Sequence, residues 1–455
     1  MFGRRTEPSP TRRIVRGLIW AAFAAVLVLR YGVFREYYAE YHRERAEEGR
    51  REGGVMAQAW TGGGGGNWRQ GRRRGERTPA RVRAAQQPVP ADFPRFEIQI
   101  APKDVETLRG YHWSGWGGQE VERPAVMATV KESGVLYTNV EIKLKGAAGS
   151  FRPFDDKPAW TLNFSKHAPH QQFKGFSKFS LNNSVQDDSF LCEIITREMF
   201  VEAGVPAPQA GHATAVVNGR DLGLYVMVEG YGKPFLKRHF RDTRGNLYDS
   251  GFCRDIDAPL DTNSGDHPED RSDLEQLLRA ALEPQAKARE TKLKQILDLD
   301  RFMTMLALES ITCHWDGYSM NRNNYRVFHD LQVDKLIFLP HGLDQMFGIR
   351  RSSPHMELLP PMRGVVSDAV LSLPGAEEVF LKRVASLTTQ VFVAEKLTRR
   401  VQGLAAKLRP TLAAYGPDFV SQHQAACDYL VQRIETRAKS VSMQLAFFQE
   451  AVAKK

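Results

Sequence analysis

Two aspartates in the second half of the chain, Asp316 and Asp344, are spaced so that they could act on one substrate. Asp316 follows a helical pattern and lies in the segment CHWDGYSMNRNNY, which leads into a strand pattern over residues 325–330. A second strand pattern, over residues 335–340, runs directly into HGLDQMFG, which carries Asp344. Two strands separated by so few residues pair as a hairpin, so we expect its open end to bring the two carboxylates together.

This arrangement of carboxylates suits phosphoryl transfer. That reaction needs one carboxylate to orient the acceptor hydroxyl, a second to hold magnesium against the phosphates, and an amide oxygen to complete the metal shell. Protein kinases take these groups from an H-x-D-x-x-x-x-N loop and a D-F-G turn. His314, Asp316 and Asn321 match the first spacing. The segment Asp344–Gly348, DQMFG, is a stretched form of the second.

The surrounding sequence resembles the CotH kinase-like family, best known from bacterial spore coats. The resemblance rests on the run CHWDGYSMNRNNYRVF…IFLPHGLDQMFG and on upstream segments in the family's order. These segments are VEIKLKGAAGSFRPFDDKPAWTLNF, FKGFSKFSLNNSVQDDSFLCEIITREMFVEAGVPAP, NGRDLGLYVMVEGYGKPFLKRHF and GNLYDSGF. It covers residues 93–348, and we expect it to continue into the helical tail.

The resemblance implies an atypical protein kinase fold that binds ATP with Mg²⁺ or Mn²⁺ and phosphorylates Ser or Thr of a protein. It assigns Asp316 as the catalytic aspartate and Asp344 as the metal-binding aspartate. For the asparagine of the metal shell, Asn321 fits ordinary kinase spacing, whereas Asn324, directly before a tyrosine, better fits the family's Asn-Tyr pattern. We therefore rank Asn324 first.

The nucleotide side of the site is expected in the first half of the chain. The segment KGAAGS, with Gly146 and Ser150, could fold over phosphates, because glycines let backbone N–H groups approach closely. A plain hairpin loop is an equal alternative. Glu229, at the end of the strand pattern LYVMVE, resembles the segment that joins the two lobes of a kinase, next to adenine.

The lysine that contacts phosphate has three candidates. Lys157, directly before the strand pattern WTLNF, is ranked first, and Lys143 and Lys145 are its rivals. Glu193, on the following helix, is the expected partner that orients this lysine.

These groups must be positioned by a sheet-rich first part and a helical second part. Alternating apolar residues predict strands in FEIQI, AVMATV, NVEIKLKG and WTLNF, and a hairpin turning at Asn218-Gly219. Between them, residues 189–204 have helical spacing, with Ser189 as the cap and Gly204 as the stop. Helical patterns dominate after residue 270, ending with residues 422–451. The order predicts a two-lobed α+β enzyme, with a kinase-like core over 93–360 and a C-terminal helical part of the same domain over 361–455.

The first 36 residues predict a signal-anchor. The run IVRGLIWAAFAAVLVL follows several arginines, which places the N-terminus in the cytoplasm and the bulk of the chain on the extracytoplasmic side, in a bacterial envelope. A cleavable signal peptide is the competing interpretation, but no small-residue cleavage site closes the run. Residues 37–92 are rich in Gly and Arg and predict a disordered tether, with a polybasic patch for anionic lipid as the alternative.

The net charge of +10 belongs almost entirely to this N-terminal part. Residues 1–92 contain eighteen Arg and nine acidic residues, so they carry +9 and the rest of the chain carries +1. A nearly neutral folded part does not favour a nucleic-acid partner. The four cysteines include no CxxC pair, which argues against a zinc ribbon or a disulfide framework.

Three other interpretations stay open. A non-catalytic envelope protein could use a kinase-like scaffold to assemble partners. A hydrolase could hold two metal ions with four side chains, His314, Asp316, His341 and Asp344. The two aspartates could also serve only to satisfy turns and loop amides.

Overall fold

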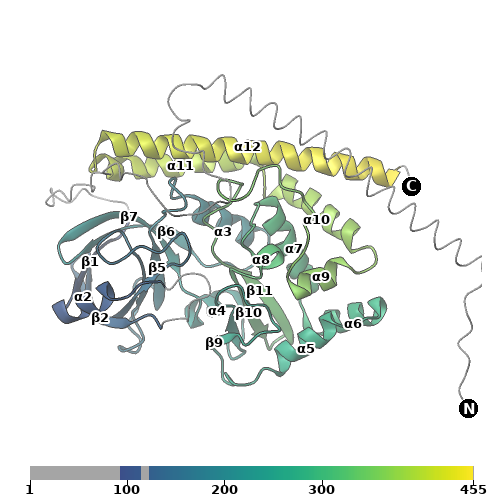
Figure 1. The fold of residues 1–455 in the computed structure, drawn as a ribbon, viewed down its shortest axis with the longest axis horizontal. Coiled ribbons are helices and arrows are strands. Elements are labelled where there is room, and N and C mark those ends of the chain that lie inside the picture. The colour runs from purple at the N-terminus through teal and green to yellow at the C-terminus, as the bar shows by residue number, and fades with distance from the viewer. Residues whose placement is uncertain (1–92, 114–121, 454–455) are drawn as a thin grey trace, which may run out of the picture. The chain divides into compact units, whose positions relative to one another are not determined.

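The first half of the folded chain closes into a β-barrel (Figure 1). The computed structural model describes residues 93–113 and 122–453. Barrel neighbours follow the order β1-β2-β3-β4-β5-β7-β6, and β1 closes the barrel by pairing in parallel with β6. The strands are β1 (Arg95–Ile100), β2 (Ala125–Glu132), β3 (Val135–Lys145), β4 (Ala159–Asn163), β5 (Lys178–Asn182), β6 (Ala210–Val217) and β7 (Arg220–Glu229).

The alternation of side chains along β3 decides which of its residues face the inside of the barrel and which face outward. Ile142 and Leu144 belong to the apolar cluster inside the barrel. Since successive side chains of a strand point to opposite faces, Lys143 and Lys145 lie on the outer face of the barrel. The expected turn at Asn218-Gly219 is confirmed, with both residues at positive φ, as a two-residue hairpin turn requires.

The same half of the chain contains three helices, α2 (Pro102–Arg109), α3 (Cys192–Glu202) and α4 (Lys233–His239). Helix α3 confirms the helix expected over residues 189–204, but its start is secured by Asp187. The carboxylate of Asp187 accepts hydrogen bonds from the backbone N–H groups of Ser189, at 3.0 Å, and Cys192, at 2.9 Å. Gly204, with φ +81°, ends the helix as expected.

A second sheet and most of the helices follow the barrel. The sheet order is β11-β10-β8-β9, from β8 (Leu247–Asp249), β9 (Asp261–Ser264), β10 (Tyr325–Asp330) and β11 (Lys335–Pro340). The expected hairpin is confirmed, with Tyr325 opposite Pro340 and Asp330 opposite Lys335. The helices are α5 (Ser272–Ala281), α6 (Ala286–Ile296), α7 (Leu299–Ile311), α8 (Tyr318–Asn321), α9 (Val365–Leu371), α10 (Ala376–Gln390), α11 (Ala394–Ala413) and α12 (Pro417–Ala453).

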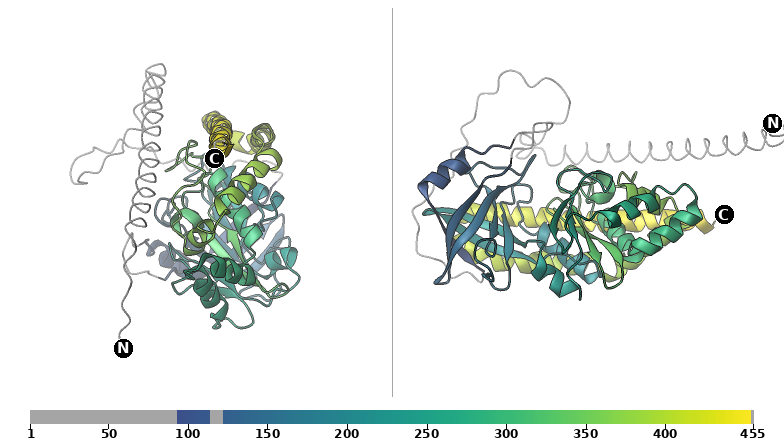
Figure 2. Two further views of the ribbon diagram at one scale, coloured as in Figure 1. Left: turned by 90° about the vertical axis from the view of Figure 1, so that its right-hand side faces the viewer. Right: turned by 90° about the horizontal axis from the view of Figure 1, so that it is seen from below.

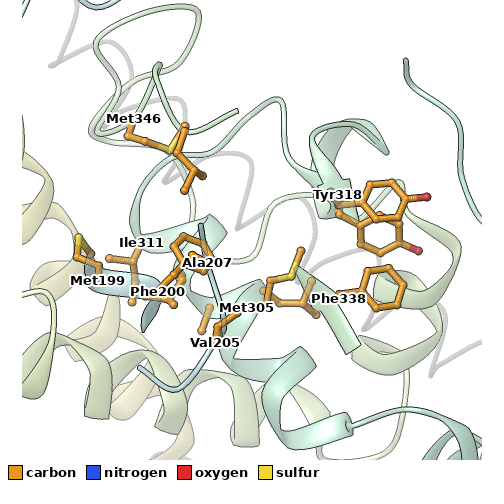
Figure 3. Close-up of a cluster of buried hydrophobic side chains, with 14 of the residues drawn as sticks. Met199, Phe200, Val205, Ala207, Met305, Ile311, Tyr318, Phe338 and Met346 are labelled. Carbon is orange, nitrogen blue, oxygen red and sulfur yellow. The ribbon is translucent and has the colours of Figure 1, made fainter. Parts of the chain in front are cut away.

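One large apolar core joins these helices to α3. Its buried residues extend along the chain from Phe190 to Val441, so the helices after residue 360 share a core with the residues before it. Figure 3 shows side chains of α3, α7, β11 and the loop after β11 gathered in this core, with Phe200, Met305, Phe338 and Met346 among them.

Helices α11 and α12 run side by side past both the barrel and the second sheet (Figures 1 and 2). His423 of α12 is 2.9 Å from the carbonyl oxygen of Ser189, just before α3. The fully buried Arg437 of α12 donates to the carbonyl oxygens of Ser310, at 2.8 Å, and Ile311, at 3.0 Å, at the end of α7. One helix therefore braces the segment before α3 and the segment that leads to Asp316.

The expectation of a mixed α+β fold, sheet-rich first and helical second, is confirmed. The expected anchor, residues 1–36, and the expected tether, residues 37–92, lie outside the described residues. Across residues 93–113 and 122–453, each helix is too short or too polar to span a membrane.

Candidate functional site

Asp316 lies in a cage of asparagine amides, in the loop that follows α7. Its Oδ1 accepts hydrogen bonds from the side chains of Asn321, at 2.5 Å, and Asn323, at 3.1 Å. Its Oδ2 accepts one from Asn324, at 2.9 Å. These donors are neutral, so they fix the direction of the carboxylate without cancelling its charge. The sequence analysis missed Asn323, although the pattern N-x-N-N over residues 321–324 could have suggested that several amides act together.

A buried carboxylate, Glu309 of α7, builds the loop that carries Asp316. Glu309 is completely buried and accepts hydrogen bonds from the backbone N–H of Tyr318, at 3.0 Å, and of Ser319, at 2.9 Å. A Cβ at Gly317 would lie 2.6 Å from a Glu309 oxygen, so this close packing requires glycine there. Glu309 therefore holds the start of α8 and so the position of Asp316, a role that the sequence analysis missed.

The turn that carries Asp344 is fastened to the same loop. The backbone N–H of His341 donates to the carbonyl oxygen of Asn324 at 2.8 Å, and the ring of His314 is 3.1 Å from the carbonyl oxygen of His341. Gly342 has φ +60°, and a Cβ there would lie 2.4 Å from the Asn324 side chain. Asn324 thus touches Asp316 with its amide nitrogen and packs against the turn two residues before Asp344.

Asp344 lies among charged residues. Burial is the first cause that raises its pKa to about 7, the charge of Glu193 adds to the rise, and the charge of Lys145 opposes it. Asp187, at the start of α3, also raises this pKa. Charges on β3, on α3 and on the segment before α3 therefore act on Asp344, and its role in binding a metal stays a prediction.

Lys145 is the candidate lysine that the structure links to Glu193, through the side chain of Asn182. Its ammonium group donates to the side-chain oxygen of Asn182, at the end of β5, at 2.9 Å. Burial lowers the pKa of Lys145, and the negative charges of Glu193 and Asp344 oppose this effect. Glu193 is buried and accepts a hydrogen bond from Arg197 at 2.7 Å, one helical turn further along α3.

Lys157, which the sequence analysis ranked first, lies in different surroundings. Its ammonium nitrogen is 5.1 Å from the ring centres of both Phe190 and Tyr225, and burial lowers its pKa to about 8. The charges that act on it are those of Asp156 and Asp221. These surroundings favour Lys145 over Lys157, and which lysine contacts phosphate stays a prediction. The physical reason is that Lys157 lies in a loop, where strand alternation does not set the direction of a side chain.

The segment KGAAGS forms the loop after β3. Gly146 has φ +104°, and a Cβ there would lie 3.0 Å from the backbone of Phe151, so the turn needs glycine. The hydroxyl of Ser150 accepts from the backbone N–H of Ala147 at 3.1 Å and donates to its carbonyl oxygen at 3.0 Å. These bonds account for the shape of the loop, and a contact with phosphates stays a prediction.

Glu229 ends β7 where the chain leaves the barrel for α4. It is buried, and its Oε2 accepts from the backbone N–H of Gln209, at 3.0 Å, and from Arg238. Its other oxygen, Oε1, has no hydrogen-bond partner within the described part of the chain. Glu229 thus lies at the connection between barrel and helices, as expected, and its role near adenine stays a prediction.

The site does not show the ligand cluster that a two-metal hydrolase needs. In the described parts of the chain, no three His, Cys, Asp or Glu side chains come together as a metal-holding group. His314 directs its Nε2 to the carbonyl oxygen of His341, and Asp316 is surrounded by amides.

Comparison with known proteins identifies one family. The model of the family described as CotH kinase protein matches residues 142–441. The inner spore coat protein H of Bacillus subtilis is 22% identical over 274 residues, which make up 57% of this chain and 70% of that protein. Invasin CotH3 of Rhizopus delemar is 24% identical over 238 residues, 48% of this chain and 39% of that protein. The chain thus spans much less of the fungal relative than of the bacterial one.

Two solved structures also show similarity. The HipA, HipB and operator DNA complex of Shewanella oneidensis matches with a TM-score of 0.30 and 14% identity, over 59% of this chain and 60% of that one. The proinflammatory kinase CtkA of Helicobacter pylori matches with a TM-score of 0.28 and 9% identity, over 76% of this chain and 97% of that one.

Proposed function

The chain belongs to the CotH kinase family, and on that premise we propose that it is an ATP-dependent phosphotransferase with a two-lobed kinase-like fold that phosphorylates Ser or Thr of proteins. One observation supports this most. Asn324 donates a hydrogen bond to Asp316 and packs against Gly342, in the turn that leads to Asp344. A phosphotransferase needs these two functions side by side, one for the acceptor hydroxyl and one for metal and phosphate.

The donor groups fit magnesium and a nucleotide phosphate. Asp344 is a carboxylate that carries an electrostatic penalty, which a divalent cation would relieve. Asn324 uses its amide nitrogen for Asp316, so its side-chain oxygen is the end left for a cation. A carboxylate, an amide oxygen and phosphate oxygens are ligands that Mg²⁺ accepts. Bound there, Mg²⁺ or Mn²⁺ would neutralise charge on the phosphates.

The residues of the chain then have distinct tasks. Asp316, held by three amides, orients the acceptor hydroxyl and accepts its hydrogen bond. Lys145 binds a phosphate oxygen, since a buried ammonium group attracts an anion strongly. Asn321 supports Asp316 and is the second candidate for the metal shell.

We place the acceptor protein in the cell envelope or on a cell surface. The bacterial relative is named as an inner spore coat protein, and the N-terminal sequence predicts a membrane anchor with the catalytic part outside the cytoplasm. Nucleic acid is not among the partners that we propose, because the folded part carries almost no net charge.

The test is phosphate transfer by the purified full-length chain. With labelled ATP and Mg²⁺ or Mn²⁺, we expect the chain to label itself or an envelope protein fraction. Asp344→Ala should reduce labelling to background, whereas the exposed Asp257→Ala should leave it unchanged. If Asp344→Ala labels as well as the parent, the proposed metal site is wrong. If the parent neither labels nor gains thermal stability from any nucleotide and metal, the scaffold function replaces the kinase.

A further inference from the structure

Asn182, the last residue of β5, lies between the lysine and the glutamate of the proposed site. Its side-chain oxygen accepts a hydrogen bond from the ammonium group of Lys145 at 2.9 Å. Its side-chain nitrogen donates to Glu193 at 3.3 Å. A strand of the barrel, β3, is thus linked to helix α3 through a side chain from a third element.

The direction of the Asn182 amide is fixed by its neighbours. An ammonium group can only donate hydrogen bonds, and an ionised carboxylate can only accept them. Asn182 must therefore turn its oxygen to Lys145 and its nitrogen to Glu193. A side chain with only one kind of polar group could not make both bonds.

Glu193 is itself held firmly on α3. Its other oxygen accepts from Arg197 at 2.7 Å, and the side chains of Arg197 and Glu193 are only 2% and 5% exposed. This series of hydrogen bonds ends at Lys145. The charge of Asp344 also acts on Lys145 and raises its pKa. The hydrogen bonds therefore run in the order Arg197, Glu193, Asn182 and Lys145.

We propose that Asn182 is a positioning residue that couples helix α3 to the phosphate-binding lysine without neutralising that lysine. The inference rests on the proposed function. Protein kinases join this lysine and glutamate directly as an ion pair. An amide in between transmits the position of Glu193, yet it leaves Lys145 with its full charge and with two further N–H donors for phosphate.

A set of three variants tests the coupling by kinetics. Asn182→Asp places a carboxylate against Glu193, so we expect kcat/KM for ATP to fall by about tenfold or more. Glu193→Gln alone should also lose activity. In the double variant, the carboxylate introduced on β5 can accept from both Lys145 and the amide introduced on α3. The double variant should therefore recover the part of the loss that comes from repulsion by Glu193, whereas the part that comes from pairing Lys145 with a carboxylate should remain. Losses that multiply instead of recovering would overturn the inference.

A second measurement does not depend on activity. Acylation of Lys145 by an amine-reactive reagent, followed by mass spectrometry, should become several-fold faster in Asn182→Ala, because the ammonium group loses its acceptor. Lys157, packed between two rings, serves as the internal control and should react at an unchanged rate. If Asn182→Ala does not fold, Asn182→Asp replaces it in this measurement. Acylation of Lys145 should then be slower, because a carboxylate beside the ammonium group keeps it protonated. An unchanged rate at Lys145 would refute the coupling.

The two proposals fail in different ways. A parent chain that transfers phosphate while the double variant shows no recovery would refute the coupling and leave the phosphotransferase standing. A parent chain without any transfer, but with the expected change in Lys145 acylation, would refute the phosphotransferase and retain Asn182 as the link between α3 and Lys145.

Discussion

The two aspartates of the site are held in opposite ways. Asp316 is surrounded by three neutral amides, each of which donates a hydrogen bond to it. Asp344 is surrounded by charges, of which Glu193 and Asp187 repel its ionised form and Lys145 attracts it. The first carboxylate is satisfied by the protein alone. The second carries a penalty that the protein does not remove.

This difference fits the two tasks that we propose for the site. A group that orients a hydroxyl should have one fixed direction, and hydrogen bonds from a rigid loop provide that. A group that binds a cation should gain strongly when the cation arrives, and a buried carboxylate with a raised pKa does so. Glu309 builds the rigid loop, whereas α3 and β3 supply the charges around Asp344. The ionised form of Asp316 is therefore stabilised by its surroundings, whereas burial and neighbouring carboxylates disfavour the ionised form of Asp344.

The largest effect on stability is expected from Asp316→Asn. The new amide would turn an N–H group toward an asparagine side chain that is itself a donor, for example that of Asn324, 2.9 Å from the present Oδ2. Leaving such donors without an acceptor costs about 1–3 kcal/mol. Urea unfolding of the full-length chain without nucleotide or metal should show this loss. Asp257→Asn, at an exposed aspartate, is the matched control and should leave the unfolding free energy unchanged.

The same isosteric change at Asp344 should act in the opposite direction. Asp344→Asn removes a charge that burial and Glu193 both disfavour. In buffer with a chelator, we expect the melting temperature to rise on the order of 2 °C, the size of a change of about 1 kcal/mol in a large domain. Added Mg²⁺ and ATP should stabilise the parent and not this variant. A fall in melting temperature, as expected for Asp316→Asn, would contradict the claim that the surroundings of Asp344 disfavour its ionised form.

Local sequence was enough to predict the hairpin between Asp316 and Asp344. The strands over residues 325–330 and 335–340 pair with each other, so their register depends on a short turn and on nearby apolar residues. The same holds for the turn at Asn218-Gly219, where residue types that tolerate positive φ stand at the two central positions. In both places the residues that decide the structure are close in sequence.

The choice of lysine could not be made in the same way. Lys145, Asn182 and Glu193 come from β3, β5 and α3, and they are brought together by the pairing of β3 and β5 with β4 and by the packing of α3. Strand alternation with the buried Ile142 and Leu144 places Lys145 on the outer face of the barrel. Sequence does not say which helix covers that face. For a similar reason Arg437, more than a hundred residues after α7, could not be recognised as a brace for the loop of Asp316.

His329 of β10 is held by charged partners, in contrast to Asp316, which is held by neutral amides. The smallest expected effect on stability is at His329. Its ring nitrogens lie 3.0 Å from Asp273 and 2.9 Å from Asp334, and Tyr248 donates to Asp273 at 2.7 Å. Hydrogen bonding to Asp273 comes first among the causes that raise the pKa of His329 above 6.5. A raised pKa in the folded state means that the stabilisation is complete below pH 6.5 and is lost as the pH rises through the folded value.

We therefore expect His329→Gln to lower the free energy of unfolding by up to about 1 kcal/mol at pH 5.5 and by much less at pH 8.5. Asp334→Asn removes only the exposed partner and should reproduce a small part of the effect. Urea unfolding at the two pH values measures both. Because neutral amides do not titrate, the loss caused by Asp316→Asn should be the same at both pH values. A loss at Asp316 that changes with pH as strongly as the loss at His329 would show that the cage of Asp316 depends on charge and not on amide hydrogen bonds.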